Sequence, residues 1–252
     1  MEAVYRNFKI IVVEDSEKMG VLAAGQFAKQ IASKPSSVIG LATGSTPLST
    51  YKNLIALCGR GEIDFKSVTS FNLDEYYPIK KSNTQSYDYF MRDNLFNYIN
   101  IAPENIFIPD GEADDAERAC WDYEVLIKNA GGIDLQLLGL GNNGHIGFNE
   151  PCDAFPKATH CVTLDESTIE ANARFFDSAA DVPRQALSMG IGTIMDAKHI
   201  LLLISGAAKA DIARKVLFGD ITPKVPGSVL QLHRSVTVIL DEGAAEQAMS
   251  YL

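Results

Sequence analysis

The chain has 252 residues, of which 46% are hydrophobic and 21% charged, so it can bury the core of one sizeable domain. Its formal net charge is −10 and its basic runs are no longer than Lys80-Lys81, which argues against a nucleic-acid partner. The longest apolar runs, such as Ile200–Ile204, have strand length and cannot span a membrane, and no signal-peptide core begins the chain. We therefore expect a single domain over residues 1–252 in a soluble, cytoplasmic protein.

Short β-rich runs alternate along the chain with amphipathic segments of helical length. This alternation is typical of an α/β fold with a mostly parallel central sheet and helices on both faces. The predicted strands are Lys9–Val13, Ser37–Ala42, Val68–Leu73, Ile133–Leu138, His199–Ser205 and Val236–Leu240. The predicted helices include Ser16–Ala32, Pro47–Leu57, Gln85–Tyr98, Ala113–Lys128 and Ala207–Leu217. Pro47 suits a first helical position, with Thr46 as the cap before it.

Four cysteines are scattered through the chain without C-x-x-C spacing, at Cys58, Cys120, Cys152 and Cys161. In a reducing compartment such cysteines are usually buried thiols, so we predict neither disulfides nor a metal site.

Four predicted strands lead directly into polar segments. In an open parallel sheet the ligand binds beyond the carboxyl ends of the strands. If these strands are neighbours, hydroxyl groups, a carboxylate, an imidazole and an ammonium group converge on one crevice. The segments are Thr43-Gly44-Ser45-Thr46-Pro47, Asp74-Glu75, the GNNGH loop after Leu138, and Gly206-Ala-Ala-Lys209.

Two of these polar segments, and one arginine outside them, could bind a phosphate. The TGSTP segment, with Thr43, Gly44, Ser45 and Thr46, can wrap a phosphate at a helix N-terminus, although an ordinary helix cap is equally compatible with it. Lys209 begins a predicted helix, where the dipole disfavours a cation, and this favours an anionic partner. Arg174, in ANARFF, could clamp a phosphate with two hydrogen bonds, whereas a solvated helix face is the more frequent role of such an arginine.

The segment LGLGNNGHIGFNEP, Leu138–Pro151, presents His145 and Glu150 together in a glycine-rich loop. A carboxylate that orients an imidazole is a common acid–base pair, although spacing alone is equally compatible with a structural histidine. Asp74, after an apolar strand, could be a half-buried general base or a turn-forming aspartate. The segment also satisfies G-x-G-x-x-G with Asp165 beyond it, but Gly147 and Pro151 preclude the helix that a dinucleotide site needs.

These motifs together resemble the glucosamine/galactosamine-6-phosphate isomerase family. The resemblance covers nearly the whole chain, and FNLDEY and LGLGNNGHIGFNEP are its most specific motifs. TGSTP, SFNLDEYY, QSYDYFM, NARFF, GIGTIMDA and SGAAKA also occur in the family's order. The resemblance implies a modified Rossmann-like sandwich and a hydrolase acting on a C–N bond, which converts glucosamine 6-phosphate and water into fructose 6-phosphate and ammonia.

The resemblance also implies roles for individual residues. Asp74 matches the enolisation base, His145 matches the acid–base that opens the sugar ring, and Glu150 matches its carboxylate partner. The phosphate contacts would fall on Thr43, Gly44, Ser45, Thr46, Arg174 and Lys209. No cofactor and no metal are implied, and the expected partner is a small amino-sugar phosphate.

The chain departs from the family pattern at two places. Asn143 stands where many members carry an aspartate. It can still position the imidazole but supplies no charge, so we expect a different pH profile. His160 and Val162 occupy positions that are arginine and lysine in the large regulated members. The resemblance is therefore to a short, non-allosteric type, for which we expect a monomer.

Two rival functions fit the same architecture. A 6-phosphogluconolactonase shares the fold and the substrate class but needs no enolisation base, and FNLDEY with an intact NEP motif argues against it. A sugar-phosphate-sensing domain of a transcription regulator would need a DNA-reading element, which neither the predicted elements nor the net charge of −10 supports.

Overall fold

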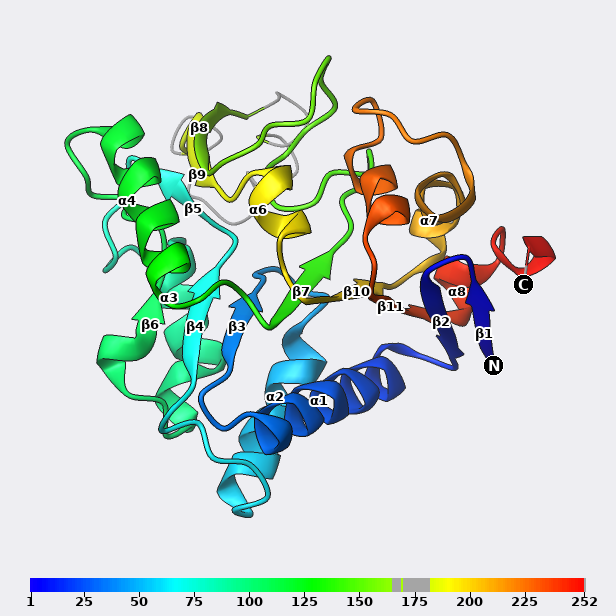
Figure 1. The fold of residues 1–252 in the computed structure, drawn as a ribbon, viewed down its shortest axis with the longest axis horizontal. Coiled ribbons are helices and arrows are strands. Elements are labelled where there is room, and N and C mark those ends of the chain that lie inside the picture. Colours follow the sequence, from blue (N-terminus) through cyan, green and yellow to red (C-terminus); the bar gives the residue numbers. More distant parts are fainter. Residues whose placement is uncertain (165–168, 170–181, 252) are drawn as a thin grey trace.

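The computed structural model of the protein describes residues 1–164, 169 and 182–251. Its main sheet has eight strands in the order β1-β2-β11-β10-β7-β3-β4-β6 (Figure 1). Every neighbouring pair is parallel except β1 and β2, which form an antiparallel edge. The strands are β1 Glu2–Tyr5, β2 Phe8–Val13, β3 Val38–Leu41, β4 Thr69–Asn72, β6 Ile106–Phe107, β7 Leu135–Gly139, β10 His199–Ile204 and β11 Val236–Asp241. The predicted α/β class and all six predicted strands are confirmed.

Helices flank this sheet and supply much of the core. Helices α1 and α2 pack against each other, and α4 lies apart from them beyond β4 (Figure 1). The aromatic ring of Tyr123 on α4 packs edge-on against Phe71 of β4, and its hydroxyl donates to the carbonyl of Asn72. The helices are α1 Ser16–Ser33, α2 Leu48–Gly59, α3 Tyr87–Asn94, α4 Ala116–Asn129, α6 Ile191–Met195, α7 Ala210–Phe218 and α8 Glu242–Ala245, with 3₁₀ turns such as Ala207–Lys209 between them.

Several predicted helix boundaries are wrong, each for a local reason. Helix α2 begins at Leu48, with Pro47 as the capping residue, and Thr46 makes no capping hydrogen bond. Helix α3 stops at Asn94 because Leu95 leaves the helical region to bury its side chain, so the predicted helix to Tyr98 is split. Asp115 caps α4 by accepting the amide of Arg118, which starts that helix later than predicted.

A second sheet, absent from our prediction, lies over the carboxyl ends of the main strands. It contains β5 Asp74–Tyr77, β9 Gln185–Ser188 and β8 His160–Thr163, all antiparallel. A small apolar cluster that includes Tyr76, Phe148 and Ala186 supports it. Because only Leu73 separates β4 from β5, the chain passes from one sheet to the other beside Asp74.

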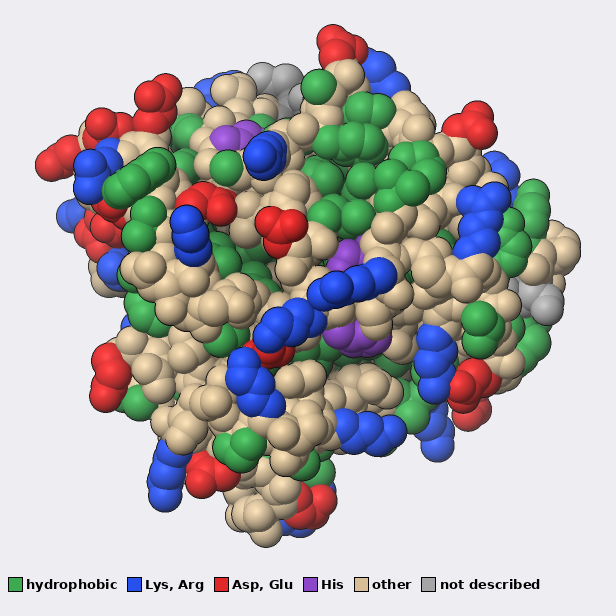
Figure 2. Space-filling model, viewed as in Figure 1, with side chains coloured by type: hydrophobic (Ala, Val, Ile, Leu, Met, Phe, Trp, Pro, Cys, Tyr) green, Lys and Arg blue, Asp and Glu red, His purple; other side chains and the backbone are tan. Residues whose placement is uncertain are grey.

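Basic side chains gather at the opposite end of the main strands. Lys34 and Lys198 both pair with the buried carboxylate of Asp134, just before β7, with N–O distances of 2.6 Å. Figure 2 shows lysine and arginine side chains across the middle of the face viewed, although the net charge is −10. These pairs precede the strands, so they cannot serve a ligand bound beyond the carboxyl ends.

The cysteines and the apolar segments of the chain were also the subject of expectations from the sequence. The cysteines are all free, but only Cys120 is buried, so the expectation that all four are buried is wrong. Cys58, Cys152 and Cys161 lie at partly exposed positions because the segments that carry them face solvent on one side. Within the described ranges, no helix is long and apolar enough to cross a membrane.

Candidate active site

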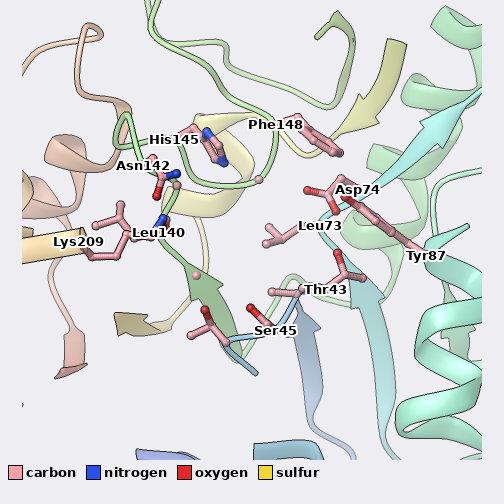
Figure 3. A pocket seen from close by; sticks show the side chains of 16 residues that line it. Thr43, Ser45, Leu73, Asp74, Tyr87, Leu140, Asn142, His145, Phe148 and Lys209 are labelled. Carbon is pink, nitrogen blue, oxygen red and sulfur yellow. Dashed lines mark hydrogen bonds between the residues drawn. The ribbon is translucent and has the colours of Figure 1, made fainter. Parts of the chain in front are cut away.

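The polar segments meet because the strands that carry them are parallel neighbours in the order β10-β7-β3-β4. A cavity of about 310 Å³ lies where they meet (Figure 3). Residues from all four segments line it: Ala42, Thr43, Gly44, Ser45, Thr46, Leu73, Asp74, Tyr87, Gly139, Leu140, Gly141, Asn142, His145, Gly147, Phe148 and Lys209. The predicted convergence of these segments is confirmed.

One end of the cavity combines hydroxyl groups with a lysine. Gly44 has φ +92°, a conformation that favours glycine and turns the chain sharply before α2. In the described part of the chain no side chain caps α2, so the hydroxyls of Ser45 and Thr46 are not used there, and both residues line the cavity just before the N-terminus of this helix. This end can therefore accept an anion.

Lys209 enters the cavity from the start of α7. Its ammonium donates to the carbonyl of Leu140 at 2.7 Å, and Figure 3 shows it beside Leu140 and Asn142. Half-burial lowers the pKa of Lys209, since desolvation disfavours its charged form. An anion in the cavity would compensate this cost. Arg174, the other predicted cation, lies outside the described residues.

Asp74 is a buried carboxylate without a hydrogen-bond partner in the part of the chain that the structure describes. Its side chain points into the cavity, and the residue is only 6% exposed, so it is more deeply buried than predicted (Figure 3). Desolvation, followed by the neighbouring charge of Glu75, raises the pKa of Asp74 to about 8. A carboxylate in this state is poised to exchange a proton near neutral pH.

Across the cavity, Asn143 links His145 to Glu150. The amide oxygen of Asn143 accepts from the backbone amide of His145 at 3.2 Å and lies 2.8 Å from ring Nδ1. Its amide nitrogen donates to Glu150 Oε2, and Glu150 Oε1 is 3.3 Å from the same Nδ1. Because the amide oxygen can only accept, Nδ1 carries the proton in the neutral ring and Nε2 is left as a base.

The loop from Gly141 to Glu150 folds back on itself to make this arrangement. A Cβ at Gly141 would lie 2.3 Å from the imidazole of His145, so only glycine lets the ring approach the backbone there. No helix begins between residues 140 and 159, which removes the basis for a dinucleotide site in this loop.

The sequence did not single out three residues that shape the cavity. Tyr87 stands beside Asp74 and lines the cavity together with Thr43, while Phe148 stacks on Tyr87 with ring centroids 6.0 Å apart. Glu75 lies behind Asp74, 2% exposed. In the sequence, Tyr87 occurs only as part of the QSYDYFM motif of the family resemblance, and that motif predicted no role for it. Among the described residues, no cluster of three or more His, Cys, Asp or Glu side chains could hold a metal ion.

Comparisons with known proteins agree on one family. A family model described as glucosamine-6-phosphate isomerases/6-phosphogluconolactonase matches residues 15–239. The chain is 56% identical over 239 residues to a protein of Clostridioides difficile (strain 630) named glucosamine-6-phosphate deaminase, covering 95% of this chain and 96% of that one. A relative of the same name from Thermoanaerobacter sp. (strain X514) is 54% identical over 237 residues, or 94% of each chain.

Solved structures give the same family by shape. A structure described as a monomeric glucosamine-6-phosphate deaminase superposes with a TM-score of 0.92 at 47% identity, covering 94% of this chain and 99% of that one. The 6-phosphogluconolactonase of Trypanosoma brucei superposes with a TM-score of 0.71 at 21% identity, covering 94% and 97%, and so shares the fold. The chain therefore belongs to the family of glucosamine-6-phosphate isomerases and 6-phosphogluconolactonases.

Proposed function

We propose that this protein converts glucosamine 6-phosphate and water into fructose 6-phosphate and ammonia. The relatives with 52–56% identity carry the name of this activity, and each of them aligns with nearly the whole chain. The cavity supplies the groups that the reaction needs: an anion-binding end, an oriented imidazole and a buried carboxylate. The order of steps below follows from where these groups lie.

The sugar phosphate would bind at the end of the cavity formed by the turn Thr43–Thr46 and Lys209. Hydroxyl groups and free amides of α2 would donate to the phosphate, and the half-buried ammonium of Lys209 would balance its charge. By its resemblance to the family, Arg174 would complete this site. Fixing the phosphate places the far end of the sugar, C1 and C2, between His145 and Asp74.

His145 would open the sugar ring. With Nδ1–H donated to Asn143, the free Nε2 can take the proton from the hydroxyl on C1 and deliver it to the ring oxygen. Glu150 lies 3.3 Å from Nδ1 and stabilises the imidazolium formed between these two transfers. The product of this step is the open-chain aldehyde.

Asp74 would carry the isomerisation. Its carboxylate takes the proton from C2 of the aldehyde, which gives an enolamine, and returns a proton to C1. The C2 iminium then adds water and expels ammonia, leaving the ketone of fructose 6-phosphate. Water is consumed and a C–N bond is broken, so the net change is hydrolytic, but the step that Asp74 performs is an aldose–ketose isomerisation.

The single observation that carries this proposal is the 6% exposed carboxylate of Asp74, which faces the cavity and has no hydrogen-bond partner among the described residues. A lactonase has no use for a base at C2, so the same observation disfavours 6-phosphogluconolactone as the substrate. The test is incubation of the protein with glucosamine 6-phosphate and, separately, with 6-phosphogluconolactone, in the presence of a metal chelator. We expect ammonia release from the first and only background hydrolysis of the second, whereas the reverse pattern would overturn the proposal.

A further inference from the structure

Glu75 is a buried carboxylate that the proposed reaction does not use. It follows Asp74 on β5, where successive side chains point to opposite faces. Asp74 therefore faces the cavity, while Glu75 faces the first turn of α3. Three backbone N–H groups donate to it, and no charged side chain of the described residues does, so its burial needs an explanation.

The contacts of Glu75 hold the beginning of α3. Its Oε1 accepts from the amides of Tyr76 and Tyr87 at 2.8 Å, and its Oε2 accepts from the amide of Asp88 at 2.9 Å. First-turn amides have no partner inside a helix, and a carboxylate at that end is favoured by the helix dipole. The hydroxyl of Ser86 accepts the next amide, that of Tyr89. Glu75 thus fixes where α3 begins relative to β5.

The first residue of α3 is Tyr87, and its ring is a wall of the cavity. The ring lies beside Asp74 (Figure 3) and packs on Tyr76 and Phe148. Thr43, in the turn assigned to the phosphate, lines the same cavity. Tyr87 therefore lines the cavity beside Asp74 and packs on Phe148, so we expect its ring to limit the access of water to the Asp74 carboxylate.

We propose that Glu75 is a positioning residue of this active site, which holds α3 so that Tyr87 closes the cavity between Thr43 and Asp74. The inference rests on the proposed function, since Asp74 matters only if it exchanges a proton with substrate. The side chain of Glu75 does not line the cavity, so we infer that it acts through Tyr87, whose amide it accepts. A displaced Tyr87 would admit water to Asp74 and slow the isomerisation.

Two substitutions at Glu75 distinguish the effect of its negative charge from the effect of its contact with α3. Glu75→Gln keeps the length but loses the charge and one acceptor, whereas Glu75→Asp keeps the charge but draws the carboxylate back from α3. We expect both to lower kcat about tenfold, because both loosen the first turn of α3. Inhibition by inorganic phosphate should change less than about threefold, since Lys209 and the Gly44–Thr46 turn do not contact Glu75. A Glu75→Asp variant with native kcat would overturn the positioning role.

The pH profile gives a readout that a general loss of stability would not move. Among the described residues, the titratable groups around Asp74 are Glu75 and Tyr76 on β5, Tyr51 on α2, Tyr87 on α3, Tyr123 on α4, and His145 and Lys209 across the cavity. Asp88 faces Glu75 from α3. Glu75→Gln removes a neighbouring negative charge and lets water reach Asp74, so the acid limb of kcat/KM should move to lower pH.

The matched control is Glu124→Gln on α4. Glu124 is also a carboxylate that accepts three hydrogen bonds, from the amide and hydroxyl of Thr159 and the hydroxyl of Thr193, but it is not part of the cavity. This variant should keep the native kcat and the native acid limb. An effect equal to that of Glu75→Gln would mean that replacing any buried carboxylate that accepts several hydrogen bonds lowers activity. The proposal would then fail.

A double-mutant comparison tests the route through Tyr87. In a Tyr87→Ala background, Glu75→Gln should change kcat less than twofold, because the wall that Glu75 positions is already absent. An undiminished tenfold effect there would contradict the inference. If the Glu75 variants do not fold, Tyr87→Ala alone tests the inference. A Tyr87→Ala variant with native kcat and an unchanged acid limb of kcat/KM would overturn the positioning role. A native protein without deaminase activity would instead refute the proposed function.

Discussion

Asp74 and Asn143 are the two residues whose surroundings most directly predict chemistry. Asp74 is buried and has no hydrogen-bond partner in the described ranges, so its environment favours the protonated carboxyl, and its pKa is raised to about 8. Asn143 has the opposite character, because its amide is satisfied on both sides by His145 and Glu150. Asp74 is therefore suited to exchange a proton, whereas Asn143 is suited to orient His145 and Glu150.

The raised pKa of Asp74 makes stability depend on pH. In the unfolded chain this carboxyl ionises near pH 4, while in the folded protein it stays protonated to about pH 8. The folded state is therefore penalised increasingly between these values, at most on the order of 1 kcal/mol per pH unit. Asp74→Asn removes the penalty, so its stability advantage over the native protein should grow from pH 5 to pH 8. Urea unfolding at pH 5, 6.5 and 8 measures this, and a pH-independent difference would contradict it.

Asn143→Asp replaces an amide donor with a second carboxylate beside Glu150. The hydrogen bond from Asn143 to Glu150 is lost, and two adjacent carboxylates keep one of them protonated to higher pH. We expect kcat/KM to fall more at pH 6 than at pH 8. The check is the ratio of variant to native kcat/KM across this range. A ratio that stays constant with pH would show that Asn143 acts by shape alone, and a ratio that falls as the pH rises would contradict the expected effect of the second carboxylate.

At the scale of elements, the site depends on where four strands end. β3, β4, β7 and β10 are neighbours, so the turn before α2, the carboxylate at β5, the glycine loop and the start of α7 meet. Lys209 illustrates the result, since its position at the beginning of α7 brings the ammonium to the carbonyl of Leu140 across the cavity mouth.

Lys209→Ala should weaken substrate binding mainly because the phosphate loses a charged hydrogen-bond donor. Loss of a charged hydrogen bond costs roughly 1.5–3 kcal/mol, which corresponds to an increase in KM of about 10-fold to 150-fold. Arg174→Ala is expected to act in the same direction by the family resemblance. The control is Lys215→Ala, which removes an exposed lysine of the same helix that pairs with Asp211. Native KM and native inhibition by inorganic phosphate in Lys209→Ala would show that the phosphate binds elsewhere.

The sequence predicted six strands of the main sheet and the convergence of their polar ends, because long apolar runs and helix-length spacing are local signals. It missed the short edge strands β1 and β6 of this sheet, and it missed β5, β8 and β9, whose four-residue strands pair residues far apart in the chain. The burial of Asp74 was underestimated for the same reason, since this second sheet and α3 cover it. Glu75 could not be recognised, because its partners are backbone amides that carry no sequence signal.

At the scale of the whole molecule, the resemblance to the short, non-allosteric type predicts a monomer without allosteric regulation. The solved relative with 47% identity is described as monomeric. His160 and Val162 lie on β8, where the regulated members carry arginine and lysine by the family resemblance. Burial lowers the pKa of His160, which keeps it neutral at pH 7, and Val162 has no charge. A dianionic effector would meet no permanent cation at either position.

We therefore expect hyperbolic kinetics that N-acetylglucosamine 6-phosphate does not alter. Without a ligand that distinguishes two states, no population shift can occur. Initial rates over a range of substrate concentrations, with and without this sugar phosphate, check the kinetics, and light scattering should give the monomer mass of 27.4 kDa. A sigmoidal curve that becomes hyperbolic on its addition would contradict this account.

The most direct test of the proposed chemistry is turnover of glucosamine 6-phosphate by the native protein and by Asp74→Asn. The native protein should release ammonia and fructose 6-phosphate in equal amounts. The amide keeps the shape of the side chain but cannot accept the proton from C2, so kcat should fall by on the order of 10²–10⁴. Inhibition by inorganic phosphate should stay near the native value. Native turnover in Asp74→Asn would contradict the assignment of this carboxylate as the base.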